Sequence, residues 1–239
     1  MGERRGLRAG RRLLGGMLWM LLLGSTPASA DEPATPVYVP PLLGSAGVVV
    51  GAGSRGVSLG DLALCALAPD HVGLSSRASP TLYWFSRGSL PGPPRLTLTT
   101  AGTDSVLLDT ELAIPAANGV HRLVLAEHGV ALREDVDYRW ELSLPSPRST
   151  TDEALTVSGY IRYRPVPPAV SARFNGLNGA QLPAVYAGAG YWYDAVWLLS
   201  ELIRAHPDEP RFREQRAALL ETVPLPVVVA HDRAERDFQ

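Results

Sequence analysis

The chain has 239 residues and a formal net charge of −2, and all of its 22 basic side chains are arginines because the sequence contains no lysine. This charge balance argues against a general nucleic-acid binder, which needs a concentrated basic surface. The absence of lysine excludes a Schiff-base enzyme, a P-loop phosphate site and a Ser–Lys dyad. The single cysteine cannot form an internal disulfide, so stability must come from packing.

Residues 1–30 have the three parts of a secretory signal peptide. Five arginines precede the apolar run "LLGGMLWMLLLG", and Ala28-Ser29-Ala30 forms a small-residue cleavage site. We predict cleavage after Ala30 and a periplasmic or secreted protein, exported by either the general secretory or the twin-arginine route. The apolar run is short for a membrane span, so we expect no stable span after cleavage. Removing five arginines and one glutamate lowers the net charge to −6.

The first half of the remaining chain predicts a leader and a sheet domain. Residues 31–50 are rich in proline and predict an extended leader. Residues 51–168 contain six short apolar segments separated by Gly, Pro, Asn and Asp turns, which is typical of a β-sandwich. Between Tyr138 and Leu144, apolar and polar residues alternate, which predicts an antiparallel strand with one buried face and one exposed face.

The pattern changes to a helical period near the C-terminus. Residues 169–225 predict a helical hairpin packed on the sandwich, with one helix face formed by Trp192, Val196, Leu199 and Ile203. About one and a half tetratricopeptide repeats would also fit, but a solenoid needs roughly three repeats to bury a core, so we favour the hairpin. Residues 226–239 predict a flexible tail. The expected fold is mainly β with α: an antiparallel β-sandwich followed by a C-terminal α-helical hairpin.

The stretch "VVVGAGSRG" contains two patterns that are associated with enzymes. Gly51-x-Gly53-x-x-Gly56 resembles a dinucleotide-binding loop, and Ser54 could be read as the serine of a nucleophile elbow. Both motifs need a parallel sheet around them, whereas the following segments predict antiparallel strands. The histidines and acids also lack the paired spacing of a metal site. We therefore assign no catalytic, cofactor-binding or metal-binding residue and expect no cofactor.

Five side chains are candidates for interaction with a partner. Tyr160 and Arg162 alternate on a predicted strand, where tyrosine and arginine can stack on a base or a sugar. The other three lie in the glycine-rich stretch and in the helical segment: Arg55, Tyr186 and Tyr193.

Several segments, taken in order, resemble the bacterial domain of unknown function 928 family. They include "GAGSRG", "PTLYWF", "VDYRWELSL", "VSGYIRYR" and "AGAGYWYDAVWLLSEL", and the resemblance covers about residues 45–225. Members of that family are generally exported bacterial proteins with no assigned activity, and the resemblance implies the same here. Cysteines found in later strands of some members are absent from "ELSLPSPRSTTDEAL", which puts a disulfide in doubt.

These patterns favour a binding protein over an enzyme. We expect an exported, non-enzymatic binding or assembly module of the bacterial envelope, with an envelope protein as its partner and no nucleic-acid ligand. Two alternatives stay open, namely a secreted serine hydrolase that uses Ser54 and a carbohydrate-binding module. The sequence leaves the oligomeric state open.

Overall fold

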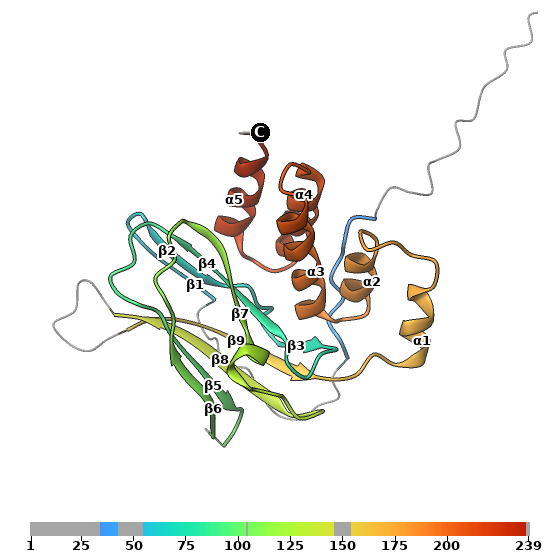
Figure 1. Ribbon diagram of the computed structural model, residues 1–239, viewed down its shortest axis with the longest axis horizontal. Coiled ribbons are helices and arrows are strands. Elements are labelled where there is room, and N and C mark those ends of the chain that lie inside the picture. Colours follow the sequence, from blue (N-terminus) through green and yellow to red (C-terminus); the bar gives the residue numbers. More distant parts are fainter. Residues whose placement is uncertain (1–33, 43–54, 104, 146–153, 238–239) are drawn as a thin grey trace, which may run out of the picture. The chain divides into compact units, whose positions relative to one another are not determined.

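The computed structural model describes residues 34–42, 55–103, 105–145 and 154–237, in which strands are followed by helices (Figure 1). The predicted signal peptide lies outside the described residues, as do the first part of the glycine-rich stretch through Ser54 and the last two residues. The following account concerns the described part of the chain.

Nine strands form two sheets. Sheet A has the order β1 (Gly56–Leu59), β2 (Leu62–Ala66), β4 (Thr81–Arg87) and β7 (Gly119–Val124). Sheet B has the order β3 (Val72–Ser75), β9 (Leu155–Tyr163), β8 (Asp137–Leu144), β5 (Arg95–Thr100) and β6 (Val106–Glu111). The predicted β-rich fold with C-terminal helices is confirmed.

Strand pairing is antiparallel with one exception. β3 pairs in parallel with β9, in a register that places Val72 opposite Tyr160, so sheet B is mixed. A parallel strand at the edge of an otherwise antiparallel sheet is a common arrangement. No alternation in the sequence indicates this strand, because all four residues of β3 are buried.

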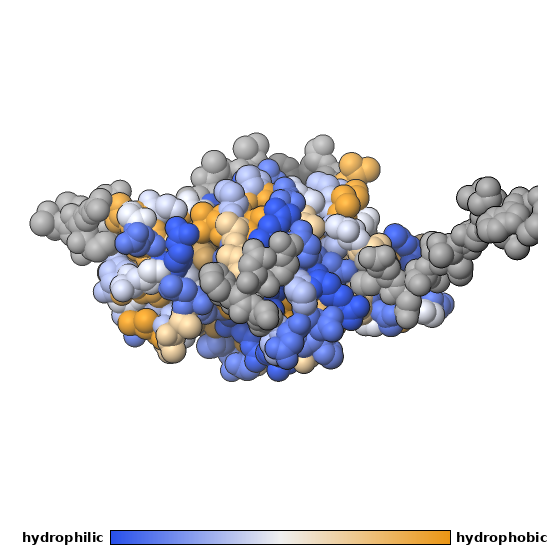
Figure 2. Space-filling model, turned by 90° about the horizontal axis from the view of Figure 1, so that it is seen from above, coloured by the Kyte–Doolittle hydropathy of each residue, from blue (hydrophilic) through white to orange (hydrophobic). Residues whose placement is uncertain are grey.

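The burial pattern explains why the strands form where they do. Side chains of β8 alternate between partly exposed and buried, and Tyr138, Trp140, Leu142 and Leu144 are each at most 1% exposed. Six of the seven residues of β4 are buried, because helix α3 (Trp192–Ala205) packs on this central strand of sheet A. Hydrophobic side chains appear in small groups among hydrophilic ones on the face shown in Figure 2, an ordinary pattern for a folded domain.

The helices follow the sheets in the sequence. The short segments are η1 (Leu125–His128), α1 (Pro168–Ser171), η2 (Ala172–Phe174) and α2 (Leu182–Gly188). The predicted face of α3 is confirmed, since Trp192, Val196, Leu199 and Ile203 are all at most 9% exposed. α4 (Pro210–Glu221) begins at a proline, which suits the first turn because its missing N–H has no partner there.

The prediction of a flexible tail is wrong for residues 226–237. This segment forms helix α5 (Pro226–Asp237), which packs against α4 and contacts β7. Val228 is fully buried, and Asp232, at 1% exposure, forms an ion pair with Arg216 of α4. The apolar run "VVV" therefore packs into the core together with a buried salt bridge, a tertiary contact that local sequence does not reveal.

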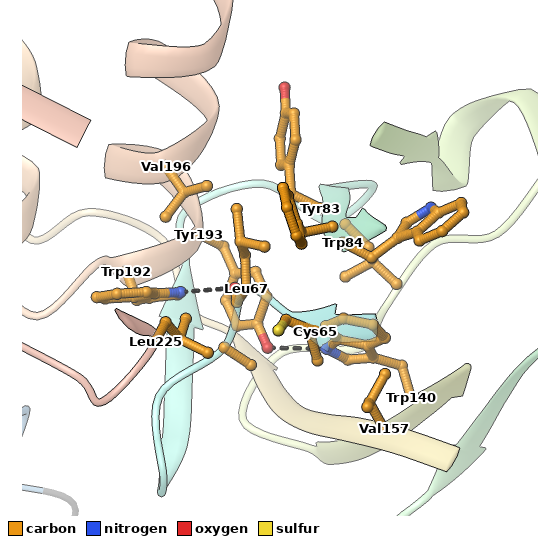
Figure 3. Close-up of a cluster of buried hydrophobic side chains, with 14 of the residues drawn as sticks. Cys65, Leu67, Tyr83, Trp84, Trp140, Val157, Trp192, Tyr193, Val196 and Leu225 are labelled. Atoms are coloured by element: carbon orange, nitrogen blue, oxygen red, sulfur yellow. Dashed lines mark hydrogen bonds between the residues drawn. The ribbon is translucent and has the colours of Figure 1, made fainter. Parts of the chain in front are cut away.

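A set of residues that we call the junction joins α3 to the sandwich: Leu67, Trp140, Gly159, Trp192 and Tyr193 (Figure 3). Trp140 donates its indole N–H to the Tyr193 hydroxyl oxygen at 2.9 Å, and that hydroxyl donates to the Tyr160 carbonyl at 2.9 Å. The indole of Trp192 donates to the Leu67 carbonyl at 2.9 Å. The polar atoms of these aromatic side chains are therefore satisfied inside the core.

Gly159 is required by close packing in the junction. A Cβ atom at this position would lie 2.4 Å from Cβ of Ala68 and 2.8 Å from Nε1 of Trp140. Both distances are shorter than a van der Waals contact, so a side chain would push the two sheets apart. The glycine lets β9 approach the segment that follows β2.

Two further contacts hold the start of α3. Asp194 is 2% exposed and accepts hydrogen bonds from the backbone N–H and the hydroxyl of Ser76, at 2.7 and 2.6 Å. Burial raises the pKa of its carboxyl to about 6. In the leader, Tyr38 packs edge-on against Trp192, and its hydroxyl lies 2.8 Å from Nε2 of His71. This part of the predicted leader is anchored to the domain.

Candidate functional site: a cleft beside strand β7

A cleft of about 600 Å³ lies beside β7, one of the two edge strands of sheet A. This volume is within the range of about 300–1,000 Å³ that is usual for small-molecule sites. Three consecutive residues of β7 line it, namely Val120, His121 and Arg122. Because neighbouring side chains on a strand point to opposite faces, the cleft extends around both sides of this edge strand.

Six segments of the chain build the walls of the cleft. The sheet side comes from β4 and β7, together with the residues that follow β6. The helical side comes from α3, α4 and α5, which supply Ser200, Glu201, Ile203, Arg204, Arg213, Arg216, His231 and Asp232. The cleft therefore exists only when the C-terminal helices are folded against sheet A.

Two residues of β4 that line the cleft each carry a buried donor without a hydrogen-bond partner among the described residues: the Tyr83 hydroxyl and the Trp84 indole N–H. The two side chains are 4% and 2% exposed. Figure 3 shows that both polar atoms point away from the junction residues. A buried polar group without a partner costs about 1–3 kcal/mol, so these two donors are unusual in a native core.

The surroundings of the Tyr83 hydroxyl place it on the cleft side. Burial is the main reason that its pKa rises to about 12, and the charges of Glu201, Arg122 and Arg216 act on it as well. All three of these residues line the cleft. The Ser200 hydroxyl is also close to Tyr83, but no hydrogen bond of ordinary geometry joins the two. Ser200 instead accepts a hydrogen bond from Arg216 at 3.1 Å.

Charged side chains in the cleft carry an excess of positive charge. Four arginines line it with only two carboxylates, Glu201 and Asp232. Asp232 is fully engaged, because Arg216 donates to both of its oxygens, at 2.8 and 2.6 Å. Glu201 pairs with both Arg122, at 3.0 Å, and Arg204. Arg213 donates to the Pro207 carbonyl at 2.6 Å and has no carboxylate partner in the described chain.

His121 is a neutral group in the cleft at physiological pH. Burial, followed by the charge of nearby His231, lowers its pKa to about 4. Its Nε2 lies 2.8 Å from the Ser86 hydroxyl oxygen, an arrangement that resembles part of a serine hydrolase site. However, Ser86 does not line the cleft, so its hydroxyl is not placed to attack a substrate bound there. A histidine with so low a pKa is also a weak general base.

The comparisons with known proteins assign a family. The family model described as Domain of Unknown Function (DUF928) matches residues 50–232, which is most of the chain. The chain belongs to the DUF928 family. None of the curated proteins matches it. A solved structure, a multi-domain immunophilin from Arabidopsis thaliana, is similar at 8% identity and a TM-score of 0.18, covering 78% of this chain and 97% of the immunophilin. This likeness is too slight to carry an argument.

None of the five sequence-predicted interaction residues lines the cleft of this DUF928 protein. Tyr193 is 2% exposed and belongs to the junction, where its hydroxyl joins Trp140 to Tyr160. Arg162 forms a two-point ion pair with Asp137, at 2.6 and 2.8 Å. Tyr160 lies on the same face of β9 as Arg162, so the structure brings these two together.

The other two residues lie elsewhere. Tyr186 of α2 packs against Phe174 and Tyr191, with ring centroids 4.8 and 6.1 Å apart. Arg55 precedes β1, and its Nη1 is buried without a hydrogen-bond partner among the described residues. Its charge assists the His71 hydrogen bond in lowering the pKa of Asp70. These contacts position the side chains within the fold and do not test a role in binding.

The enzyme motifs of the glycine-rich stretch fall largely outside the described residues, and Ser54 is among those not described. Gly56 begins β1, which pairs antiparallel with β2, whereas the two motifs occur in parallel sheets. In the described part of this DUF928 chain, no group of His, Cys, Asp and Glu could hold a metal ion. No described helix is both long and apolar enough to cross a membrane.

Proposed function

We propose that this DUF928 protein is an exported, non-enzymatic binding module that holds a small ligand in the cleft beside β7. The observation that carries the proposal is the pair of buried, unpartnered donors of Tyr83 and Trp84 on the cleft wall. A ligand that accepts hydrogen bonds from them would remove a cost that the free protein bears. The neighbouring histidine and arginines supply further polar contacts, as expected in a site that fixes a ligand's orientation.

Export is the second part of the proposal, and residues 1–30 support it. The test is to express the full chain in a bacterium with its own N-terminus and to sequence the N-terminus of the protein from the periplasm and the medium. Export with cleavage after Ala30 gives a chain that begins at Asp31. A chain that stays in the cytoplasm with residues 1–30 attached would contradict this part.

Binding is tested with the purified protein and defined compounds. Glucose, glucuronate, citrate, glucose 6-phosphate and arginine would be titrated while the tryptophan fluorescence is recorded, because Trp84 lies in the cleft wall. We expect at least one compound to change the fluorescence saturably and, by isothermal titration calorimetry, to bind at least tenfold more weakly to the Tyr83→Phe, Trp84→Phe double variant, which lacks the Trp84 fluorophore. A Tyr163→Phe, Trp197→Phe variant is the matched control, because neither residue lines the cleft.

Two outcomes would count against the binding proposal. If none of the five compounds bound, the cleft would not be a site for the small polar molecules that its chemistry suggests. If a compound bound equally well to the double variant and to the parent protein, its site would lie elsewhere. Saturable binding of glucose alone would favour the carbohydrate-binding alternative within the same cleft.

A further inference from the structure

The arginines of the cleft are unequally engaged, and this difference indicates the ligand class. Arg216 is 7% exposed and is held on both sides by Asp232 and Ser200, so it belongs to the protein's own framework. Arg122 and Arg204 share the single carboxylate of Glu201, and their side chains are 48% and 64% exposed. Each of these two can therefore turn further N–H groups towards a ligand, because a guanidinium has five donors.

Arg213 adds a charge that no carboxylate of the described residues balances. It is partly buried on the helical wall, and one N–H donates to the Pro207 carbonyl. Taken together, the cleft holds four arginines against two carboxylates, which leaves two positive charges in excess when the histidines are neutral. On β4, the Tyr83 hydroxyl lies on the helical side with Arg122, its cross-strand neighbour, whereas Trp84 lies on the other face of the strand against His121. Arginine forks that share one space with a neutral donor form the usual arrangement for an oxygen anion.

We propose that the cleft binds a small organic anion, whose carboxylate or phosphate group lies between the arginines of α3 and α4 and Tyr83 of β4. This inference rests on the proposed function and specifies its ligand class. The anion accepts hydrogen bonds from Arg204 and Arg213, and the remainder of the ligand lies against Tyr83 and Arg122. A neutral compound of the same size leaves the excess charge uncompensated and binds more weakly.

The test compares glucose with ligands that differ from it in charge. Isothermal titration calorimetry of the purified protein with glucose, glucuronate and glucose 6-phosphate keeps the sugar ring and changes only one substituent, while citrate tests an anion without a ring. We expect at least one anion to bind ten times more tightly than glucose. Tighter binding of glucuronate or citrate identifies a carboxylate ligand, and tighter binding of glucose 6-phosphate identifies a phosphate ligand.

Two variants on the same helix check where the anion binds. Arg213→Gln should weaken binding of the preferred anion about tenfold, whereas Arg211→Gln should leave it unchanged. Both changes remove one charge from α4, but Arg211 pairs with Glu209 and does not line the cleft. Thermal unfolding of both variants shows whether they remain folded.

The outcomes separate this inference from the proposed function. If glucose bound as tightly as the anions and the Tyr83→Phe, Trp84→Phe variant lost that binding, the cleft would be a ligand site but not an anion site. If an anion bound and both arginine variants weakened it equally, the arginines would act through general charge and the assignment to the cleft would fall. If no compound bound, both proposals would fall.

Discussion

The junction and the cleft use the same residue types in opposite ways. In the junction, Trp140 and Tyr193 are buried and their polar atoms are joined in a chain of hydrogen bonds. In the cleft wall, Tyr83 and Trp84 are nearly as buried, yet their polar atoms have no partner among the described residues. Satisfied buried groups stabilise a fold, whereas unsatisfied ones lower its stability. The difference suggests that the junction holds the domain together and the cleft serves a ligand.

The largest effect should come from breaking the ion pair behind the cleft wall. Arg216→Met leaves the carboxylate of Asp232 buried at 1% exposure without its partner. We expect the free energy of unfolding to fall by about 3–5 kcal/mol in urea denaturation. Arg233→Met, which removes exposed ion pairs with Glu214 and Glu221, is the control and should cost less than about 1 kcal/mol. Equal losses in the two variants would show that the buried pair has no special role.

A slightly smaller loss in the free energy of unfolding should follow from adding a side chain at Gly159. Gly159→Ala places a methyl group against Ala68 and Trp140, and we expect it to destabilise the protein by about 3 kcal/mol. Gly179→Ala is the control, because nothing lies within 4 Å of a Cβ atom there. The comparison is made by thermal unfolding. A Gly159→Ala protein with the parent's stability would mean that the two sheets do not meet as closely as described.

The cleft should also make stability depend on pH through His121. Its folded pKa of about 4 lies below the ordinary histidine pKa of 6.5, so between these pH values the unfolded chain binds a proton that the folded protein does not. The contribution of His121 to the free energy of unfolding is therefore fully present above pH 6.5 and falls as the pH decreases towards 4. For a half-buried ring, with allowance for solvent screening, the loss should be about 1–2 kcal/mol.

The His121→Gln variant isolates this effect. Asp194 acts in the opposite sense, because burial raises its folded pKa to about 6 and acidification below that value favours the folded state. Both proteins contain Asp194, so the difference between their stabilities at pH 7 and pH 4.5 reports His121 alone. We expect the parent to lose more stability than His121→Gln over this interval. An equal change in the free energy of unfolding between pH 7 and pH 4.5 in both proteins would contradict the assignment of the lowered pKa to His121.

The sequence predicted the parts of this fold that follow from local periodicity. Alternation between Tyr138 and Leu144 identified β8, and helical spacing from Trp192 to Ile203 identified α3. It did not predict α5, because the stability of that helix depends on the packing of Val228 and on the pair of Asp232 with Arg216. Three of the segments that resemble the family contribute to the junction, because Gly159, Trp140 and Tyr193 lie in them and meet there.

The cleft was not predictable in the same way. Its residues come from β4, β7, the segment after β6 and three helices, so no spacing in the sequence brings them together. Tyr83 and Trp84 belong to an aromatic strand that resembles any buried strand until the hydrogen bonds of each polar atom are known. Tyr193 is the opposite case. The sequence indicates it as an interaction candidate, but its hydroxyl forms hydrogen bonds within the core. Only the tertiary contacts distinguish the two kinds of tyrosine.

The most direct test of the contrast between junction and cleft is the free energy of unfolding of two matched variants, Tyr193→Phe and Tyr83→Phe, measured without ligand. Each removes one buried hydroxyl from a tyrosine that is at most 4% exposed. We predict that Tyr193→Phe loses about 1–3 kcal/mol, because it leaves the Trp140 N–H without its acceptor. Tyr83→Phe should lose less than about 0.5 kcal/mol or gain stability. A loss at Tyr83 as large as that at Tyr193 would show that its hydroxyl serves the fold, and the cleft would then be no more a ligand site than the junction.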